Sequence, residues 1–242
     1  MSFRRSWPLP ALLALLFATW LAYAPGLSGG FLFDDYVNLD ALGATGPVHD
    51  GAAFWRYLTS GSADPIGRPL ALLSFLLDGR DWPADPAPFL RTNLFLHLAN
   101  GALLFALLRL LGRRLDGPGA RTEAIALFAA GLWLLHPLFV STTLYIVQRE
   151  AMLPATFTLL GLLAWVHGRT RLDAGARRAG LAWMLGGLAL GTALAMLSKA
   201  NGILLPLLAW VLEATVLRAG AARPLPRAFR FGALVLPSAV VF

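Results

Sequence analysis

Long runs of apolar residues constrain this chain more than any other feature of its sequence. The first run, 8–24, carries no charged residue, and similar runs recur along the sequence. A run of roughly 20 such residues can cross a bilayer as a helix. The composition, 57% hydrophobic and 14% charged, also departs from that of soluble domains. These runs lack the apolar and polar alternation of barrel strands. The sequence therefore predicts an all-α polytopic membrane protein that folds as a helical bundle.

About seven membrane spans are expected. The first run resembles a signal peptide, with a cleavage-like Ala22-Tyr23-Ala24, but Pro25 disfavours cleavage and we interpret the run as an uncleaved span. The last run is too short to cross, so we expect residues 1–242 to be a transmembrane domain truncated at its C-terminal end. The spans are predicted at 8–24, 89–111, 124–139, 151–166, 181–197, 203–217 and, incompletely, 231–242.

Residues 25–88 form a long first outer loop between the first two spans. This loop contains eight of the thirteen acidic residues and two apolar stretches, 51–60 and 68–77, that are too short to span. We expect each stretch to be a helix lying in the membrane interface, with Pro69 in the first turn of the second. The proline-rich segment 81–88 is predicted to be a loop.

The distribution of charge predicts the orientation in the membrane. With the N-terminus in the cytoplasm, the cytoplasmic side receives fourteen of the twenty basic residues, and the opposite side receives nine of the thirteen acids. Short cytoplasmic loops are rich in Arg and Lys. We therefore expect a bacterial-type inner membrane protein with a periplasmic active face. The net charge of +7 reflects this orientation and not a nucleic acid partner. The absence of cysteine excludes disulfides and thiolate metal sites.

Polar and charged candidates gather on the outer side. Asp34 and Asp35 end an apolar run, where acids are costly unless they have a role. The spacing of Asn93, His97 and Asn100 places them on one helix face, where they would either line a site or form interhelical hydrogen bonds. The other candidates lie at span ends or in the outer loop: Arg68, His136, Arg149 and Lys199.

Acids and isolated cations on one side suit chemistry on a membrane-embedded substrate that bears a phosphate. The cations would neutralise the phosphate, and an acid would act as a base or a metal ligand. In the simpler interpretation, Arg149 snorkels to the interface and Lys199 complements a helix dipole. The sequence has no Walker loop, dinucleotide glycine fingerprint or Ser-His-Asp signature, which argues against ATP-driven or soluble-cofactor chemistry.

Six short motifs carry a family resemblance, in this order: Phe33-Asp34-Asp35-Tyr36, Arg68-Pro69-Leu70, Asn93 with His97 and Asn100, His136-Pro137, Arg149, and Ser198-Lys199. The chain resembles the N-terminal part of the polytopic glycosyltransferases of the C superfamily. It is most similar to the transmembrane, tetratricopeptide-repeat O-mannosyltransferases and their bacterial relatives. It departs from them at Gln148 and Ala200, where the family often has a glycine and an acid. The resemblance implies inverting transfer from a polyprenyl-phosphate sugar to a hydroxyl acceptor on protein Ser/Thr, a glycan or a lipid.

The resemblance also implies residue roles. Asp34 would be the base, and Asp35 would orient the acceptor or hold a divalent metal together with Asp34. Arg149 and Lys199 would bind the donor phosphate. The substrate site would be shaped by Arg68, Asn93, His97 and His136. Two alternatives stay open: a transporter or flippase of lipid-linked sugars, which needs no essential base, and a non-catalytic membrane subunit.

Overall fold

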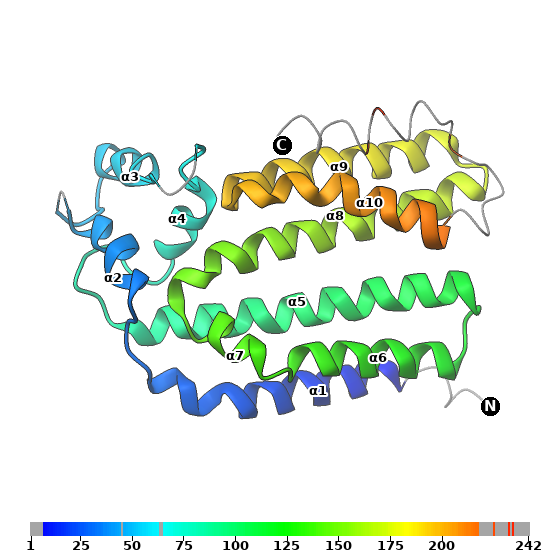
Figure 1. Cartoon of the computed structure of the whole chain (residues 1–242), viewed down its shortest axis with the longest axis horizontal. Coiled ribbons are helices and arrows are strands. Elements are labelled where there is room, and N and C mark those ends of the chain that lie inside the picture. The colour runs from blue at the N-terminus through cyan, green and yellow to red at the C-terminus, as the bar shows by residue number, and fades with distance from the viewer. Residues whose placement is uncertain are drawn as a thin grey trace.

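In a computed structural model, the chain is a bundle of long helices with shorter helices gathered at one end (Figure 1). The structure describes residues 7–44, 46–62 and 65–217, together with 225, 232 and 234. Apart from those last three, residues 218–230 and the predicted incomplete span 231–242 lie outside the described residues, as do residues 1–6. The described residues form helices and no strand, which confirms the predicted all-α class.

Five segments are long and apolar enough to cross a membrane: Pro8–Ser28, Pro86–Leu115, Ile146–Asp173, Arg177–Ser198 and Ala200–Leu217. They contain the helices α1 (Pro8–Tyr23), α5 (Pro86–Leu115), α8 (Arg149–Asp173), α9 (Arg177–Ser198) and α10 (Leu205–Leu212). These segments confirm a helical membrane protein. The count of about seven spans stays a prediction.

The predicted span 124–139 is shorter in the structure. Here α6 (Ala120–Leu134) has 15 residues, or about 22 Å at about 1.5 Å per residue, against a hydrocarbon core of about 30 Å. It ends just before His136-Pro137, because proline has no N–H to donate and disfavours helix in the residue before it. The short helix α7 (Leu138–Thr143) begins after the proline.

Three short helices gather where α5 and α8 begin: α2 (Asp34–Leu39), α3 (Gly51–Leu58) and α4 (Pro69–Phe75) (Figure 1). The last two confirm the predicted helices of the outer loop, whereas α2 was not predicted. The predicted loop 81–88 ends early, because Pro86 occupies the first turn of α5, where proline is favoured. The short helices share a buried core with α5, which includes Leu39, Leu42, Tyr57, Leu72, Phe75, Phe89 and Ile146.

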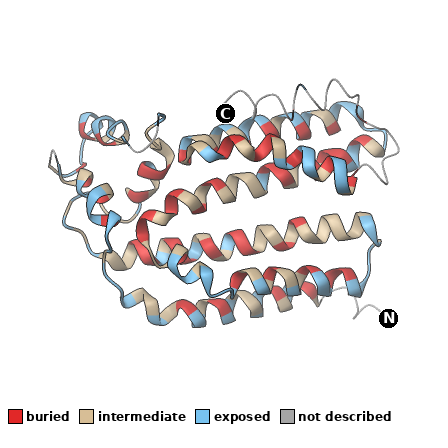
Figure 2. Ribbon diagram, in the orientation of Figure 1, coloured by how far each residue is buried: buried red, intermediate tan, exposed pale blue. Residues whose placement is uncertain are grey.

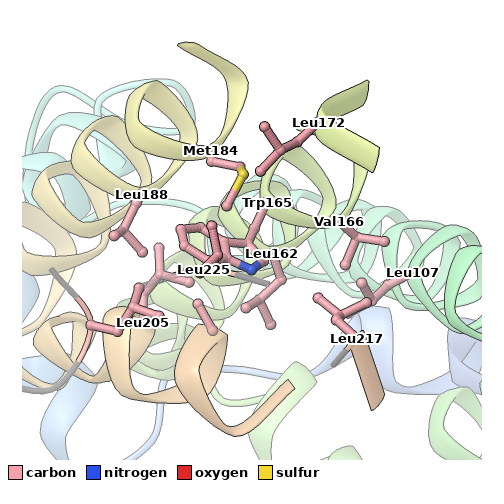
Figure 3. Packing of buried hydrophobic residues seen from close by; sticks show 12 residues of the cluster. Leu107, Leu162, Trp165, Val166, Leu172, Met184, Leu188, Leu205, Leu217 and Leu225 are labelled. Carbon is pink, nitrogen blue, oxygen red and sulfur yellow. The ribbon is translucent and has the colours of Figure 1, made fainter. Parts of the chain in front are cut away.

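The helices α8 and α9 pack closely around a second core (Figure 3). In this core Trp165 of α8 lies with Met184 of α9 and Leu205 of α10. A Cβ atom added to Gly168 would lie 2.6 Å from the carbonyl oxygen of Gly180, so glycine at this contact lets the two backbones approach. The connection expected between the predicted spans 151–166 and 181–197 is shorter in the structure, because α8 continues as far as Asp173.

Figure 2 shows exposed residues, in pale blue, along the long helices, and many of the exposed residues are large and apolar. On α1, for example, Leu9, Leu13 and Phe17 are 63%, 57% and 64% exposed. A soluble monomer rarely exposes so many large apolar side chains together on one helix. Such exposure is expected of a surface that faces lipid. The buried faces of the long helices meet inside the bundle, so packing between helices and contact with lipid together account for the apolar runs.

Candidate active site

The two adjacent acids at the start of α2 lie in opposite environments. Asp35 is fully buried, and its Oδ2 and Oδ1 accept hydrogen bonds from the backbone N–H of Leu32 (2.9 Å) and Val147 (2.7 Å). Burial raises the pKa of the Asp35 carboxyl, although these backbone bonds lower it. Asp34 is exposed. Asp35 therefore anchors the segment, whereas the Asp34 carboxylate lies at the surface, hydrogen-bonded to the Tyr145 hydroxyl group.

Tyr145 holds the backbone of Asp34. The Asp34 N–H donates to Tyr145 Oη at 2.9 Å, across 111 positions of sequence. The preceding residue, Phe33, is 83% exposed and has φ 28° and ψ −100°, a sparsely populated conformation for a bulky side chain. Contacts from Tyr145 and Val147 hold the chain in this conformation. Sequence reasoning missed Tyr145, because no local pattern indicates a contact so distant along the chain.

Arg149 is fully buried at the first turn of α8. Its Nε donates to Asn93 Oδ1 at 2.7 Å, and its two terminal nitrogens donate to the carbonyl oxygens of Ser74 and Phe89, both at 2.9 Å. It also forms an ion pair with Asp78 Oδ2 at 2.6 Å. All three guanidinium nitrogens thus contact protein acceptors. The predicted contact between Arg149 and a donor phosphate stays a prediction.

A second ion pair lies beside the first. Arg68, the residue before α4, pairs with Glu150, which follows Arg149 in sequence. The side chains of Arg68 and Glu150 are 17% and 7% exposed. Together with Asp78, the cluster holds two cations and two acids, and this balance makes burial tolerable. Sequence reasoning did not identify the two acids as partners, because only their outer location was visible in the sequence.

The two predicted histidines lie near the end of α6. His97 is 2% exposed, with its Nε2 2.9 Å from the carbonyl oxygen of Leu134 and its ring stacked on Trp133 at a centroid distance of 4.8 Å. His136 is exposed, and its Nδ1 accepts the N–H of Leu138 at 3.2 Å. The contacts of His97 join α5 to α6, and the contact of His136 lies at the start of α7. The predicted substrate-shaping roles of both histidines stay predictions.

Lys199 lies at the C-terminal end of α9, a helix that contacts α4. It follows α9 with an extended backbone (φ −165°, ψ 143°), which confirms the predicted break between the last two described spans. Among the described residues, no hydrogen bond or ion pair engages its ammonium group. The predicted contact between Lys199 and a donor phosphate stays a prediction.

A cavity of about 650 Å³ lies between α3, α4 and α8. Its polar lining residues include His49, Asp50 and Arg80, and its apolar wall includes Leu153 and Phe157 of α8. The described residues that line it include none of the eight predicted site residues. The cavity and the acid pair are therefore separate features of the end of the bundle that carries α2, α3 and α4.

The acid pair does not form a metal site in the described structure. Both oxygens of Asp35 accept backbone N–H groups, which leaves Asp34 as the exposed carboxylate of the pair. Within residues 7–44, 46–62 and 65–217, no three acidic or histidine side chains converge as metal ligands would. The residues present do not fit the divalent metal considered for this pair, and we derive no step through one.

Relatives of known name cover much of the sequence. The human (Homo sapiens) and mouse (Mus musculus) proteins named protein O-mannosyl-transferase TMTC4 are each 29% identical to this chain, over 195 and 209 residues. The chain is a distant relative of these proteins. The matches cover 76% and 81% of the chain but only 26% and 28% of the relatives, so the chain spans about a quarter of their length. No protein-family model and no solved structure matches the sequence.

Proposed function

We propose that this chain acts as a membrane glycosyltransferase of the C superfamily, which moves a sugar from a polyprenyl-phosphate donor to a hydroxyl acceptor. The acceptor is a protein Ser/Thr, a glycan or a lipid. The active face is the periplasmic side of a bacterial-type inner membrane, with the N-terminus in the cytoplasm. Support comes from the named relatives, the five apolar helices and the charge distribution of the loops.

The observation that carries this proposal is the environment of Asp34. Its carboxylate is exposed, whereas its backbone is held by Tyr145 and its neighbour Asp35 is fixed by two hydrogen bonds. A general base must reach the acceptor proton and must be held in a fixed position while it does so. Asp34 meets both requirements.

The proposed reaction is a single displacement. The Asp34 carboxylate takes the proton from the acceptor hydroxyl, and the hydroxyl oxygen bonds to the anomeric carbon from the face opposite the lipid phosphate. The bond between the anomeric carbon and the phosphate oxygen breaks, and its electron pair leaves with the polyprenyl phosphate. Lys199 stabilises the charge of this leaving group. The sugar is transferred with inversion.

Sugar transfer in membranes tests the role of Asp34. We would compare the intact gene product with its Asp34→Asn and Asp40→Asn forms, using a radiolabelled polyprenyl-phosphate sugar. Asp40 is an exposed acid that follows α2, so it controls for the loss of a nearby charge. We expect Asp34→Asn to lose transfer by about 10²-fold or more, and Asp40→Asn to stay within about twofold of the parent.

Two outcomes would contradict the proposal. Full transfer by Asp34→Asn at normal protein level would exclude Asp34 as the base. Transport of a lipid-linked sugar across the membrane, at the same rate in the parent and in Asp34→Asn, would instead favour the transporter or flippase.

A further inference from the structure

A continuous series of hydrogen bonds joins the buried Arg149 to the exposed acid. Arg149 Nε donates to Asn93 Oδ1, and Asn93 Nδ2 donates to the carbonyl oxygens of Tyr145 and Ile146, both at 3.2 Å. Tyr145 then accepts the Asp34 N–H through its hydroxyl group. Asn93 is therefore the link between the ionic cluster and the segment that holds α2.

The chemistry of Arg149 determines how Asn93 is oriented. A guanidinium group can only donate, so the amide oxygen of Asn93 faces it and the amide nitrogen is left to donate to the two carbonyls. Arg149 is itself fixed by Asp78 and by the backbone of Ser74 and Phe89. Asn93 is fully buried. Its hydrogen bonds therefore fix the 3₁₀ helix η4 (Ile146–Gln148) relative to α4 and α5.

We propose that Asn93 is a positioning residue, which sets the place of the Asp34 carboxylate through Tyr145 and η4. This inference rests on the proposed role of Asp34 as the base. Replacement of Asn93 by aspartate keeps an oxygen that accepts from Arg149. It also replaces the amide nitrogen by a second oxygen, which cannot donate to the carbonyls of Tyr145 and Ile146. The variant Asn93→Asp therefore breaks the series at one defined point.

The chain offers a matched control on the same helix. Asn100 is 1% exposed, donates through Nδ2 to the Met152 carbonyl at 3.1 Å, and accepts from Thr156 Oγ1 at 2.8 Å. Asn100→Asp makes the same chemical change in a buried amide of α5. Its partners lie within α8 and have no hydrogen bond to Tyr145 or to α2 among the described residues.

Amide hydrogen exchange of the detergent-solubilised gene product tests the positioning role without reference to activity. We expect Asn93→Asp to speed exchange about tenfold at the amides of Asp34 and Val147, and Asn100→Asp to leave both amides unchanged. In the transfer assay, we expect Asn93→Asp to lower kcat about tenfold with the KM for the donor within about twofold, because the base is displaced while donor binding is kept.

Each outcome decides the inference. Unchanged exchange at Asp34 in Asn93→Asp, equal loosening in Asn100→Asp, or faster exchange with an unchanged kcat would overturn it. If Asn93→Asp fails to insert, Tyr145→Phe removes the hydroxyl group that accepts the Asp34 N–H and also hydrogen-bonds the Asp34 side chain, and faster exchange at Asp34 with lower kcat is then required. Faster exchange at Asp34, combined with full transfer by Asp34→Asn, would refute the proposed base while leaving the hydrogen-bond series itself intact.

Discussion

Two fully buried arginines lie at the ends of α8 and use different kinds of partner. Near the C-terminal end of α8, Arg169 pairs with the carboxylates of Asp173 (2.7 Å) and Glu213 (3.2 Å). At the N-terminal end, Arg149 has one carboxylate partner, an amide and two backbone carbonyls. Partners that are side chains hold helices together. Partners on the backbone also fix the path of the chain, as a site built on loops requires.

The cluster around Arg169 has a different use for its charges. Arg114 of α5 joins Asp173 at 2.5 Å, so this cluster links α5, α8 and the end of α10. Both of its cations, Arg114 and Arg169, pair with carboxylates on long helices or at their ends. Burial alone therefore does not define the role of an arginine in a membrane protein. Its role depends on which atoms its guanidinium group binds.

The largest effect is expected when either arginine is replaced. Arg149→Met and Arg169→Met each leave a buried carboxylate without its cation, so each should lower the free energy of unfolding by about 3–5 kcal/mol. Thermal unfolding in detergent measures this loss. Only Arg149→Met should also lose sugar transfer per folded molecule, because only Arg149 is joined to the segment that holds Asp34. An equal loss of transfer in Arg169→Met would break the comparison.

A smaller effect is expected from a tyrosine near the ion pairs of Arg149 and Glu150. Tyr57 is 3% exposed, and its hydroxyl group has no hydrogen-bond partner among the described residues. Tyr57→Phe should therefore raise the free energy of unfolding by up to about 1 kcal/mol, because it removes an unsatisfied polar group. Tyr23, 4% exposed, donates to the Leu134 carbonyl at 3.3 Å, so Tyr23→Phe should cost about 0.5–1.5 kcal/mol. Chemical denaturation of both variants measures the free energy of unfolding, which should rise in Tyr57→Phe and fall in Tyr23→Phe.

The smallest effect concerns pH. Burial raises the pKa of Asp35 above its ordinary value of 3.8, so the folded chain binds this proton more tightly than the unfolded chain. The contribution of Asp35 to stability should therefore fall as pH rises from 3.8 through the higher pKa of the folded state. We expect the unfolding temperature of the parent to decrease over this interval relative to that of Asp35→Asn. Parallel curves for the two proteins would contradict the assignment.

Local patterns predicted most of the helices. The connection between the predicted spans 89–111 and 124–139 and the break between 181–197 and 203–217 lie where the apolar runs are interrupted. The spacing of Asn93 and His97 correctly predicted a shared face, and both side chains are buried. The end of α6 was misplaced, because the stop at His136-Pro137 acts earlier than the apolar run ends. The short helix α2 had too few residues to produce a periodic signal.

The partners within the site could not be predicted from the sequence. The contacts of Asp35 with Val147 and of Arg149 with Asp78 join residues far apart in the chain, and they depend on how α4, α5 and α8 pack. The sequence indicated that both acids of the pair lie outside, but not that one would be buried and the other exposed. That division depends on tertiary contacts of α2 with the segment before α8.

The close contact between Gly168 and Gly180 has a consequence for the ion pairs beside it. A Cβ atom at Gly168 would meet both the Gly180 carbonyl oxygen and the Met184 side chain of α9, so a larger residue there must push the two helices apart. Gly168 directly precedes Arg169, whose pairs with Asp173 and Glu213 are made beside this contact. The absence of a side chain at one position thus contributes to the geometry of a charged cluster.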